Sequence, residues 1–163
     1  MIVLGIDPGT IVMGFGIIEC LDNEVALIKY GALNTPSRSP IGERLSFLFG
    51  NLQAIITKYQ PEVVAVEQPF IAKNVKSAFA IGRAQAIAIL AAAEGKLPCF
   101  EYTPAEIKQK VANYGASSKE QIQQMVMLQL GLKEIPEPSD AADALAVALC
   151  HIQAMQLEKL LNR

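Results

Sequence analysis

The sequence is poor in the residues that mark several classes of protein. Its 163 residues include no tryptophan, one histidine and three cysteines, and only 18% of them are charged. Cys20, Cys99 and Cys150 stand singly, without C-x-x-C spacing. This pattern favours free thiols in a reducing compartment over disulfides or a zinc knuckle, so we expect a cytoplasmic protein.

Long hydrophobic runs and a strong charge of one sign are also missing. The longest run, residues 84–93, is too short to cross a bilayer. No basic segment precedes the first apolar residues, so we expect neither a signal peptide nor a membrane partner. The net charge of −2 argues only weakly against nucleic acid, because acids that surround metal ions no longer repel DNA.

What the chain does have is a hydrophobic fraction of 52%, enough for one globular domain over residues 1–163. Apolar patterns and turn signals predict strands over 2–7, 14–20, 24–33, 63–67 and 97–102. They predict helices over 40–60, 75–94, 104–113, 119–130 and 140–161, capped by Ser39, Thr103, Ser118 and Ser139. This order predicts an α/β fold: a mixed five-stranded sheet, three antiparallel strands plus two parallel ones, with helices on both faces.

Two of the expected strands end in a carboxylate. The apolar run 2–6 leads to Asp7 and a Pro-Gly turn, and the apolar run 63–66 leads to Glu67. The helix between them permits a crossover that makes the two strands parallel. If the strands are neighbours, their ends lie about 5 Å apart, and Asp7 and Glu67 could share a cation. Asp7 alone could equally be a turn residue that caps its own loop.

Two more acids begin the last predicted helix, where Asp140 and Asp143 stand among alanines. Residues three apart share a face of a helix, and the helix dipole favours acids in the first turn. Alone, the pair is most simply explained as two acids that stabilise a helix N-terminus. With Asp7 and Glu67 it forms a set of oxygen ligands typical of Mg²⁺ or Mn²⁺, and two such ions are a common device for cutting phosphodiesters. His151 lies about 16 Å farther along the helix and is not expected to join them.

Three motifs that contain these acids resemble the RuvC family of Holliday-junction resolvases in order and spacing. They are GIDPGT at 5–10, EQPFIAKN at 67–74 and DAADALA at 140–146. The resemblance covers nearly the whole chain and implies an RNase H-like fold, a homodimer and paired symmetric nicks in four-way junction DNA. It also implies two Mg²⁺ per subunit, with Mn²⁺ as a substitute, and action with the RuvA and RuvB branch-migration proteins in recombination and repair.

The same resemblance implies roles for individual residues. Asp7, Glu67, Asp140 and Asp143 match the catalytic, metal-binding acids of the family. Phe70 matches an aromatic residue that stacks on an unpaired base, although from sequence alone it could equally fold back onto the core. The further expected DNA contacts are Lys108 and Lys119, which match residues near the scissile phosphate, with Lys73, Asn74, Lys76 and Arg83 from the region of the second motif.

Other functions remain open at this point. The four acids would also serve an RNase H-like nuclease that acts on precursor RNA or damaged duplex. The DPGT segment at 7–10 resembles the first phosphate loop of actin-like and sugar-kinase ATP-binding proteins, but those proteins need a second domain and further glycine-rich loops. A non-catalytic junction-binding protein is disfavoured, because unneutralised acids would repel DNA. The alanine-rich helix 75–94 is expected to mediate dimerisation.

Overall fold

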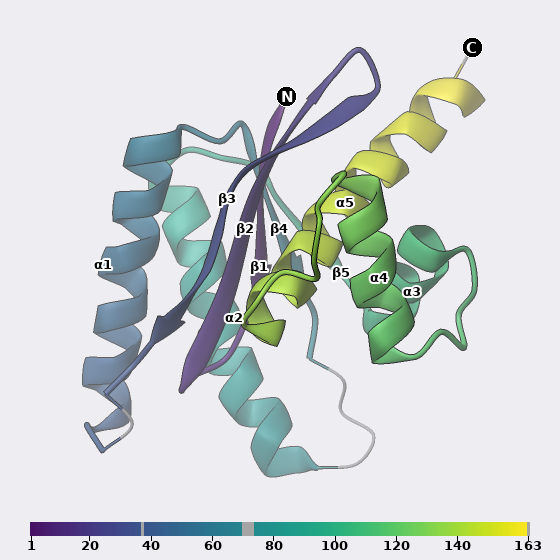
Figure 1. Cartoon of the computed structure of the whole chain (residues 1–163). Helices are drawn as coiled ribbons and strands as arrows, with labels where there is room; N and C mark the ends of the chain where they lie inside the picture. Colours follow the sequence, from purple (N-terminus) through teal and green to yellow (C-terminus); the bar gives the residue numbers. More distant parts are fainter. Residues whose placement is uncertain (37, 70–73, 163) are drawn as a thin grey trace.

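A computed structural model describes residues 1–36, 38–69 and 74–162 (Figure 1). Its strands are β1 (Ile2–Asp7), β2 (Val12–Leu21), β3 (Glu24–Asn34), β4 (Val63–Glu67) and β5 (Cys99–Tyr102). Its helices are α1 (Ile41–Tyr59), α2 (Val75–Glu94), α3 (Pro104–Ala112), α4 (Lys119–Gln129) and α5 (Ser139–Leu161). The predicted order of elements is confirmed, and the bounds differ by one or two residues at most ends.

The five strands form one mixed sheet in the order β3-β2-β1-β4-β5. β1 pairs with β2, and β2 with β3, in antiparallel orientation, whereas β4 lies parallel to both β1 and β5. Asp22 and Asn23 join β2 to β3 with positive φ angles of 50° and 70°, as a tight hairpin turn requires. The predicted combination of three antiparallel and two parallel strands is therefore confirmed.

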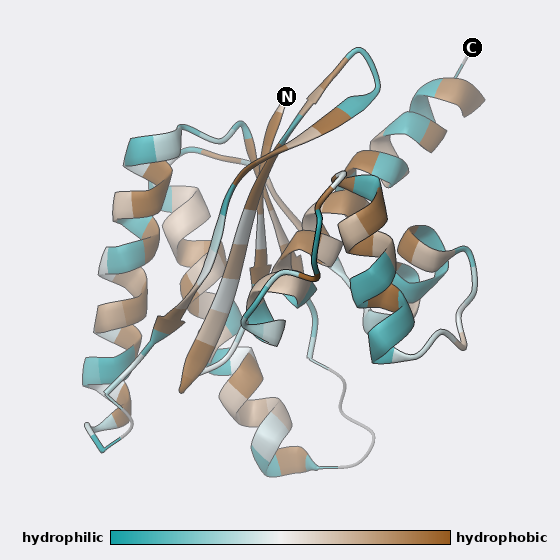
Figure 2. Ribbon diagram, in the orientation of Figure 1, coloured by the Kyte–Doolittle hydropathy of each residue, from teal (hydrophilic) through white to brown (hydrophobic). Residues whose placement is uncertain are grey.

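Helices cover both faces of the sheet, as predicted (Figure 1). On one face, α1 and α2 contribute Leu48, Leu52 and several alanines to a core with Leu4 and Val66. On the other face, α5 crosses the sheet and α3 and α4 pack against it, around a second core that includes Leu145. Figure 2 shows that apolar residues dominate the strands between these two helical layers. Burial on both faces explains why β1 and β4 read as continuous apolar runs.

Two of the four predicted helix caps are confirmed. Thr103 and Ser118 form capping boxes with Glu106 and Gln121, in which each side chain bonds the backbone N–H of the other residue. The caps predicted at Ser39 and Ser139 are wrong, because Pro40 and Pro138 occupy the cap positions, with no side-chain cap bond. At both helices the extended N-cap residue is the proline itself, with ψ angles of 152° at Pro40 and 170° at Pro138, and a proline side chain has no group that could bond the free N–H groups.

Two helices, α2 and α5, are long and apolar enough to cross a bilayer by length and composition alone. The buried core helix of a globular protein passes the same test, and residues 144–150 of α5 are all buried here. The sequence predicted no membrane-spanning segment because the apolar run 84–93 is short. Composition alone does not exclude α2 and α5 as spans, so this prediction has to be judged from how the helices pack.

Candidate active site

The carboxyl ends of β1 and β4 bring Asp7 and Glu67 together. The parallel register pairs Ile6 with Val66, so the next residue on each strand is one of the two acids. Both side chains are half-buried at this edge of the sheet. The predicted neighbourhood of the two strand-end carboxylates is thus confirmed.

Helix α5 carries the other two acids. It holds them near the ends of β1 and β4 because glycines on the strands let the helix lie unusually close to the sheet. A Cβ atom on Gly14 would overlap the backbone carbonyl oxygen of Asp140, and one on Gly5 would overlap that of Ala144. Ala141 and Ala142 are fully buried against the strands. This close contact holds the first turns of α5 at the edge where β1 and β4 end.

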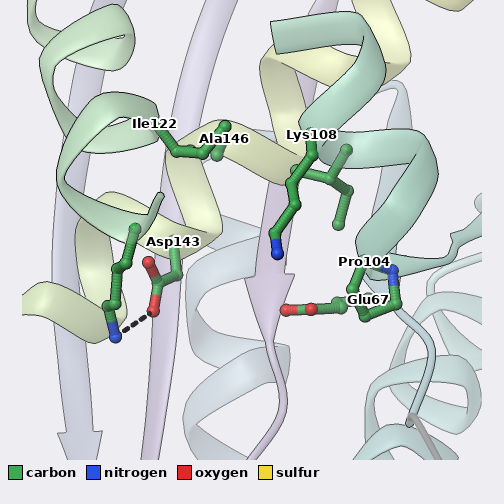
Figure 3. Close-up of a pocket in the computed structure, with 8 residues that line it drawn as sticks. Glu67, Pro104, Lys108, Ile122, Asp143 and Ala146 are labelled. Carbon is green, nitrogen blue, oxygen red and sulfur yellow. Dashed lines mark ion pairs between the residues drawn. The ribbon is translucent and has the colours of Figure 1, made fainter. Parts of the chain in front are cut away.

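A cleft of about 280 Å³ opens beside these acids (Figure 3). In Figure 3, Glu67 reaches into it from β4, Asp143 from α5 and Lys108 from α3. Lys119 of α4 forms an ion pair with Asp143, with 3.1 Å between Nζ and Oδ2. The remaining lining residues are apolar: Pro104, Ile107, Ile122 and Ala146. The predicted basic residues Lys108 and Lys119 therefore lie in the same cleft as two of the predicted acids.

Burial, and to a smaller extent mutual repulsion, raises the pKa values of three of the acids. Burial, together with the charges of Glu67, Asp143 and Asp140, raises the pKa of Asp7 to about 8. Burial and the charge of Asp143 raise the pKa of Glu67 to about 7, and burial also raises the pKa of Asp143. Groups perturbed in this way are typical of functional sites. This concentration of negative charge needs a cation, and an all-oxygen donor set fits a hard divalent ion.

In this structure the carboxylates are not arranged to coordinate one metal ion together. Within residues 1–36, 38–69 and 74–162, no three His, Cys, Asp or Glu side chains are arranged to hold a metal ion. Asp143 faces an ammonium group instead. Metal binding at this edge would therefore require side chains to move, including a separation of the pair formed by Lys119 and Asp143.

The raised pKa values predict how the stability of the metal-free protein depends on pH. Between the ordinary carboxyl values near 4 and the folded values near 7 and 8, the native state binds more protons than the unfolded state, so stability falls as pH rises. Burial lowers the pKa of His151, which opposes this trend only below about pH 6.5. Thermal unfolding in EDTA should therefore show a Tm that decreases from about pH 6.5 to 8.5. A Tm that stays constant or rises over this range would contradict the assignment, and added Mg²⁺ should reverse the decrease.

The turn that follows Asp7 is held by residues that the sequence did not single out. The Thr35 hydroxyl donates to the backbone carbonyls of Thr10 and Ile11, at 2.7 and 3.1 Å. Arg44 Nη1 of α1 donates to the same Thr10 carbonyl at 3.3 Å. These bonds restrain the turn and with it the direction of Asp7. No sequence pattern marks them, because they join segments 24 to 34 residues apart.

The remaining predicted contacts have varied positions. Asn74 caps α2 by accepting a hydrogen bond from the Ser77 backbone N–H at 3.1 Å, so its side chain already has a structural role. Lys76 and Arg83 are exposed on α2, where Arg83 borders an apolar groove with the exposed ring of Phe79. Phe70 and Lys73 lie outside the described residues. The DNA contacts assigned to all seven residues outside the acids, including Lys108 and Lys119, remain predictions, as do the catalytic roles of the four acids.

His151 does not line the cleft, and it is more than the ordinary helix-face residue that the sequence suggested. It is buried, and its Nδ1 lies 2.8 Å from the Tyr102 hydroxyl. Tyr102 ends β5 and pairs with Glu67 in the sheet. The contact therefore ties α5 to the sheet one strand away from the acids.

Comparison with known proteins identifies the family. Residues 3–151 match the family model described as crossover junction endodeoxyribonuclease RuvC. The chain belongs to the RuvC family. A relative of this name from Dehalococcoides mccartyi is 57% identical over 151 residues, which are 93% of this chain and 90% of the relative.

Solved RuvC structures agree with this assignment. Thermus thermophilus RuvC superposes with a TM-score of 0.90 at 34% identity, over 97% of each chain. The same protein in complex with a Holliday junction substrate also gives a TM-score of 0.90, over 97% of this chain and 96% of that one. These matches confirm the RNase H-like fold that the three motifs implied.

Proposed function

We propose that this chain is a crossover junction endodeoxyribonuclease that resolves Holliday junctions by paired nicks. The observation that carries the proposal is the meeting of a strand-end acid (Glu67), a helix acid (Asp143) and two lysines at one cleft in a chain of the RuvC family. A RuvC with 34% identity to this chain has been solved with a Holliday junction substrate. Junction DNA is therefore the substrate that we assign, and the work of the protein belongs to recombination and repair in the cytoplasm.

The site needs divalent metal, and we assign it two Mg²⁺ per subunit, held by Asp7, Glu67, Asp140 and Asp143. When bound, such ions lower the pKa of the attacking water and stabilise the leaving 3′ oxygen, which leaves a 5′-phosphate. The carboxylates hold and orient the reacting groups at the edge of the sheet. Lys108 and Lys119 line the same cleft, and we assign them to neutralise the charge of the phosphate that is cut.

A symmetric junction is best served by a symmetric enzyme. We assign a homodimer in which the exposed face of α2 contributes to the interface, because Val75, Phe79 and Arg83 there border an apolar groove of about 510 Å³. Two-fold symmetry would place one cleft on each of two opposed DNA strands. Phe70, Lys73, Asn74 and Lys76 belong to the stretch of sequence around the start of this helix and are assigned to the junction centre. RuvA and RuvB are the expected partners.

The substrate panel that tests this function compares a four-way junction, a linear duplex, an RNA hairpin and ATP, each with Mg²⁺. We expect two nicks at symmetry-related positions in the junction, little cutting of the duplex, and no reaction with the RNA or ATP. EDTA should stop the reaction, and the products should be ligatable because they carry 5′-phosphate and 3′-hydroxyl ends. Cleavage of the RNA hairpin in preference to the junction would favour the alternative nuclease, and unpaired single nicks would contradict the dimer.

A further inference from the structure

The ion pair between Lys119 and Asp143 is the feature of the cleft that the proposed function leaves unexplained. Lys119 Nζ lies 3.1 Å from Asp143 Oδ2, and the Asp143 side chain is only 24% exposed. Lys108 lines the same cleft, yet within the described residues it forms no ion pair. Of the two lysines, Lys119 is therefore in direct contact with an acid of the cluster, whereas Lys108 acts on Glu67 only through its charge, without a direct ion pair.

The two partners of this pair differ in how easily they can move. Asp143 belongs to the part of α5 that is pressed against the sheet, and its neighbours Ala142 and Ala144 are fully buried. Lys119 is the first residue of α4, fixed at its backbone by the Ser118 capping box, but its side chain is 56% exposed. A long, exposed lysine side chain can change direction at little cost. In this ion pair, the Lys119 side chain is therefore free to move, whereas the backbone that carries Asp143 is held in place.

The position of Lys119 also conflicts with the role assigned to Asp143. A carboxylate oxygen that binds a divalent ion has lost much of its attraction for an ammonium group, and two cations in contact with it would repel each other. Lys119 and a metal ion are therefore competitors for Asp143. This competition agrees with the finding that, within the described ranges, no three potential ligands are arranged to hold a metal ion.

We propose that Lys119 is the counter-ion of Asp143 in the metal-free protein and is exchanged for a divalent cation. The exchange releases the ammonium group inside the cleft, where the DNA phosphate is the remaining anion that it can reach. Metal binding then strengthens junction binding, and by linkage junction binding strengthens metal binding by the same factor. This inference rests on the proposed function, because it needs both ligands at the one cleft.

The direct test measures metal binding without DNA and without cleavage. Mn²⁺ binding to the whole protein is followed by the EPR signal of the free ion for wild type, Lys119→Met and Lys108→Met. Both variants remove one positive charge from the same cleft, but only Lys119→Met removes the competitor for Asp143. We expect Lys119→Met to bind Mn²⁺ at least about five-fold more tightly than wild type, and Lys108→Met to remain much closer to wild type.

Equal Mn²⁺ affinity in Lys119→Met and wild type would overturn the exchange. An equal gain in both variants would also overturn it, because the effect would then be general electrostatics and not competition. Circular dichroism and Tm of each variant show whether it is folded, and Lys119→Gln offers a second substitution if the methionine variant is not. The Mn²⁺ measurement needs no nuclease activity, so its failure is distinct from a failure of the proposed function.

A second readout follows the released lysine. Junction affinity is measured by gel shift with and without Ca²⁺, whose looser coordination is less suited to cleavage than that of Mg²⁺. Wild type and Lys108→Met should gain affinity when Ca²⁺ is added, whereas Lys119→Met should lose most of this gain. An undiminished gain in Lys119→Met would show that the lysine does not move to the phosphate, and would reject that half of the proposal.

Discussion

Asp7→Asn is expected to abolish junction cleavage while it makes the metal-free protein more stable. Asp7 is the acid whose pKa the cluster raises most, to about 8, since it is buried beside three other carboxylates. Asparagine keeps the size of the side chain but removes a charge that the fold tolerates poorly and that a metal needs. The same change should therefore lower activity and raise Tm, a combination that a residue serving only the fold would not give.

The expected loss of cleavage is about 10³-fold or more, as for other residues that act together in one catalytic unit. It is measured under single-turnover conditions with Mg²⁺, alongside junction affinity by gel shift, which should change little. Tm in EDTA near pH 8 should rise by a few degrees, and the dependence of Tm on pH should become flatter. Glu67→Gln should behave similarly, because the pKa of Glu67 is raised to about 7.

Glu43→Gln provides a matched control, since Glu43 is an exposed acid on α1 away from the cleft. It should cleave as wild type does and show the same pH dependence of Tm. Near-normal cleavage by Asp7→Asn would show that Asp7 is not a ligand of the catalytic metal. A lower Tm for Asp7→Asn in EDTA would instead show that its carboxylate stabilises the fold.

Much of the fold was predictable because its signals are local. The apolar runs 2–6 and 63–66, each followed by an acid, predicted both strands, and the helix between them predicted their parallel pairing. Capping boxes at Thr103 and Ser118 marked the starts of α3 and α4 to the residue. Where two prolines competed with serines for the cap, the prediction was wrong by one residue, because a proline in extended conformation ends the non-helical segment itself.

The candidate site was predictable in its list of acids but not in its contacts. The pairing of Asp143 with Lys119 depends on how α4 packs against α5, and no spacing in the sequence encodes that packing. The bonds from Thr35 and Arg44 to the turn after Asp7 likewise join elements that only the tertiary fold brings together. The motifs predicted which acids lie at this edge of the sheet. Only the structure shows that one of them, Asp143, is already paired with a lysine.

Gly14→Ala should show how closely the site depends on the contact between α5 and the sheet. Gly14 lies directly opposite Asp7 in the β1–β2 pairing, and its missing side chain leaves room for the Asp140 backbone carbonyl. An added Cβ would overlap backbone atoms, which cannot rotate away as a flexible side chain would. The first turn of α5 must then move outward, and Asp140 and Asp143 must move with it.

The expected destabilisation is about 3 kcal/mol, at the upper end of the usual cost of overpacking, or a Tm roughly 6–12 °C lower. Cleavage should fall by about 100-fold even at a temperature where the variant is folded, because a displacement near 1 Å in a catalytic group is enough for such a loss. Thermal unfolding and single-turnover cleavage on the same preparation separate the two effects.

Gly50→Ala in α1 is the control for adding a methyl group at a glycine, because nothing lies within 4 Å of a Cβ there. It should be neutral or slightly stabilising, since alanine favours a helix interior by up to about 1 kcal/mol over glycine. If Gly14→Ala were as stable and as active as Gly50→Ala, α5 could lie farther from β2 without harm, and the close contact would not be what places the helix acids. A large loss of cleavage with an unchanged Tm would instead mean that α5 shifts readily and that its position is held mainly for catalysis.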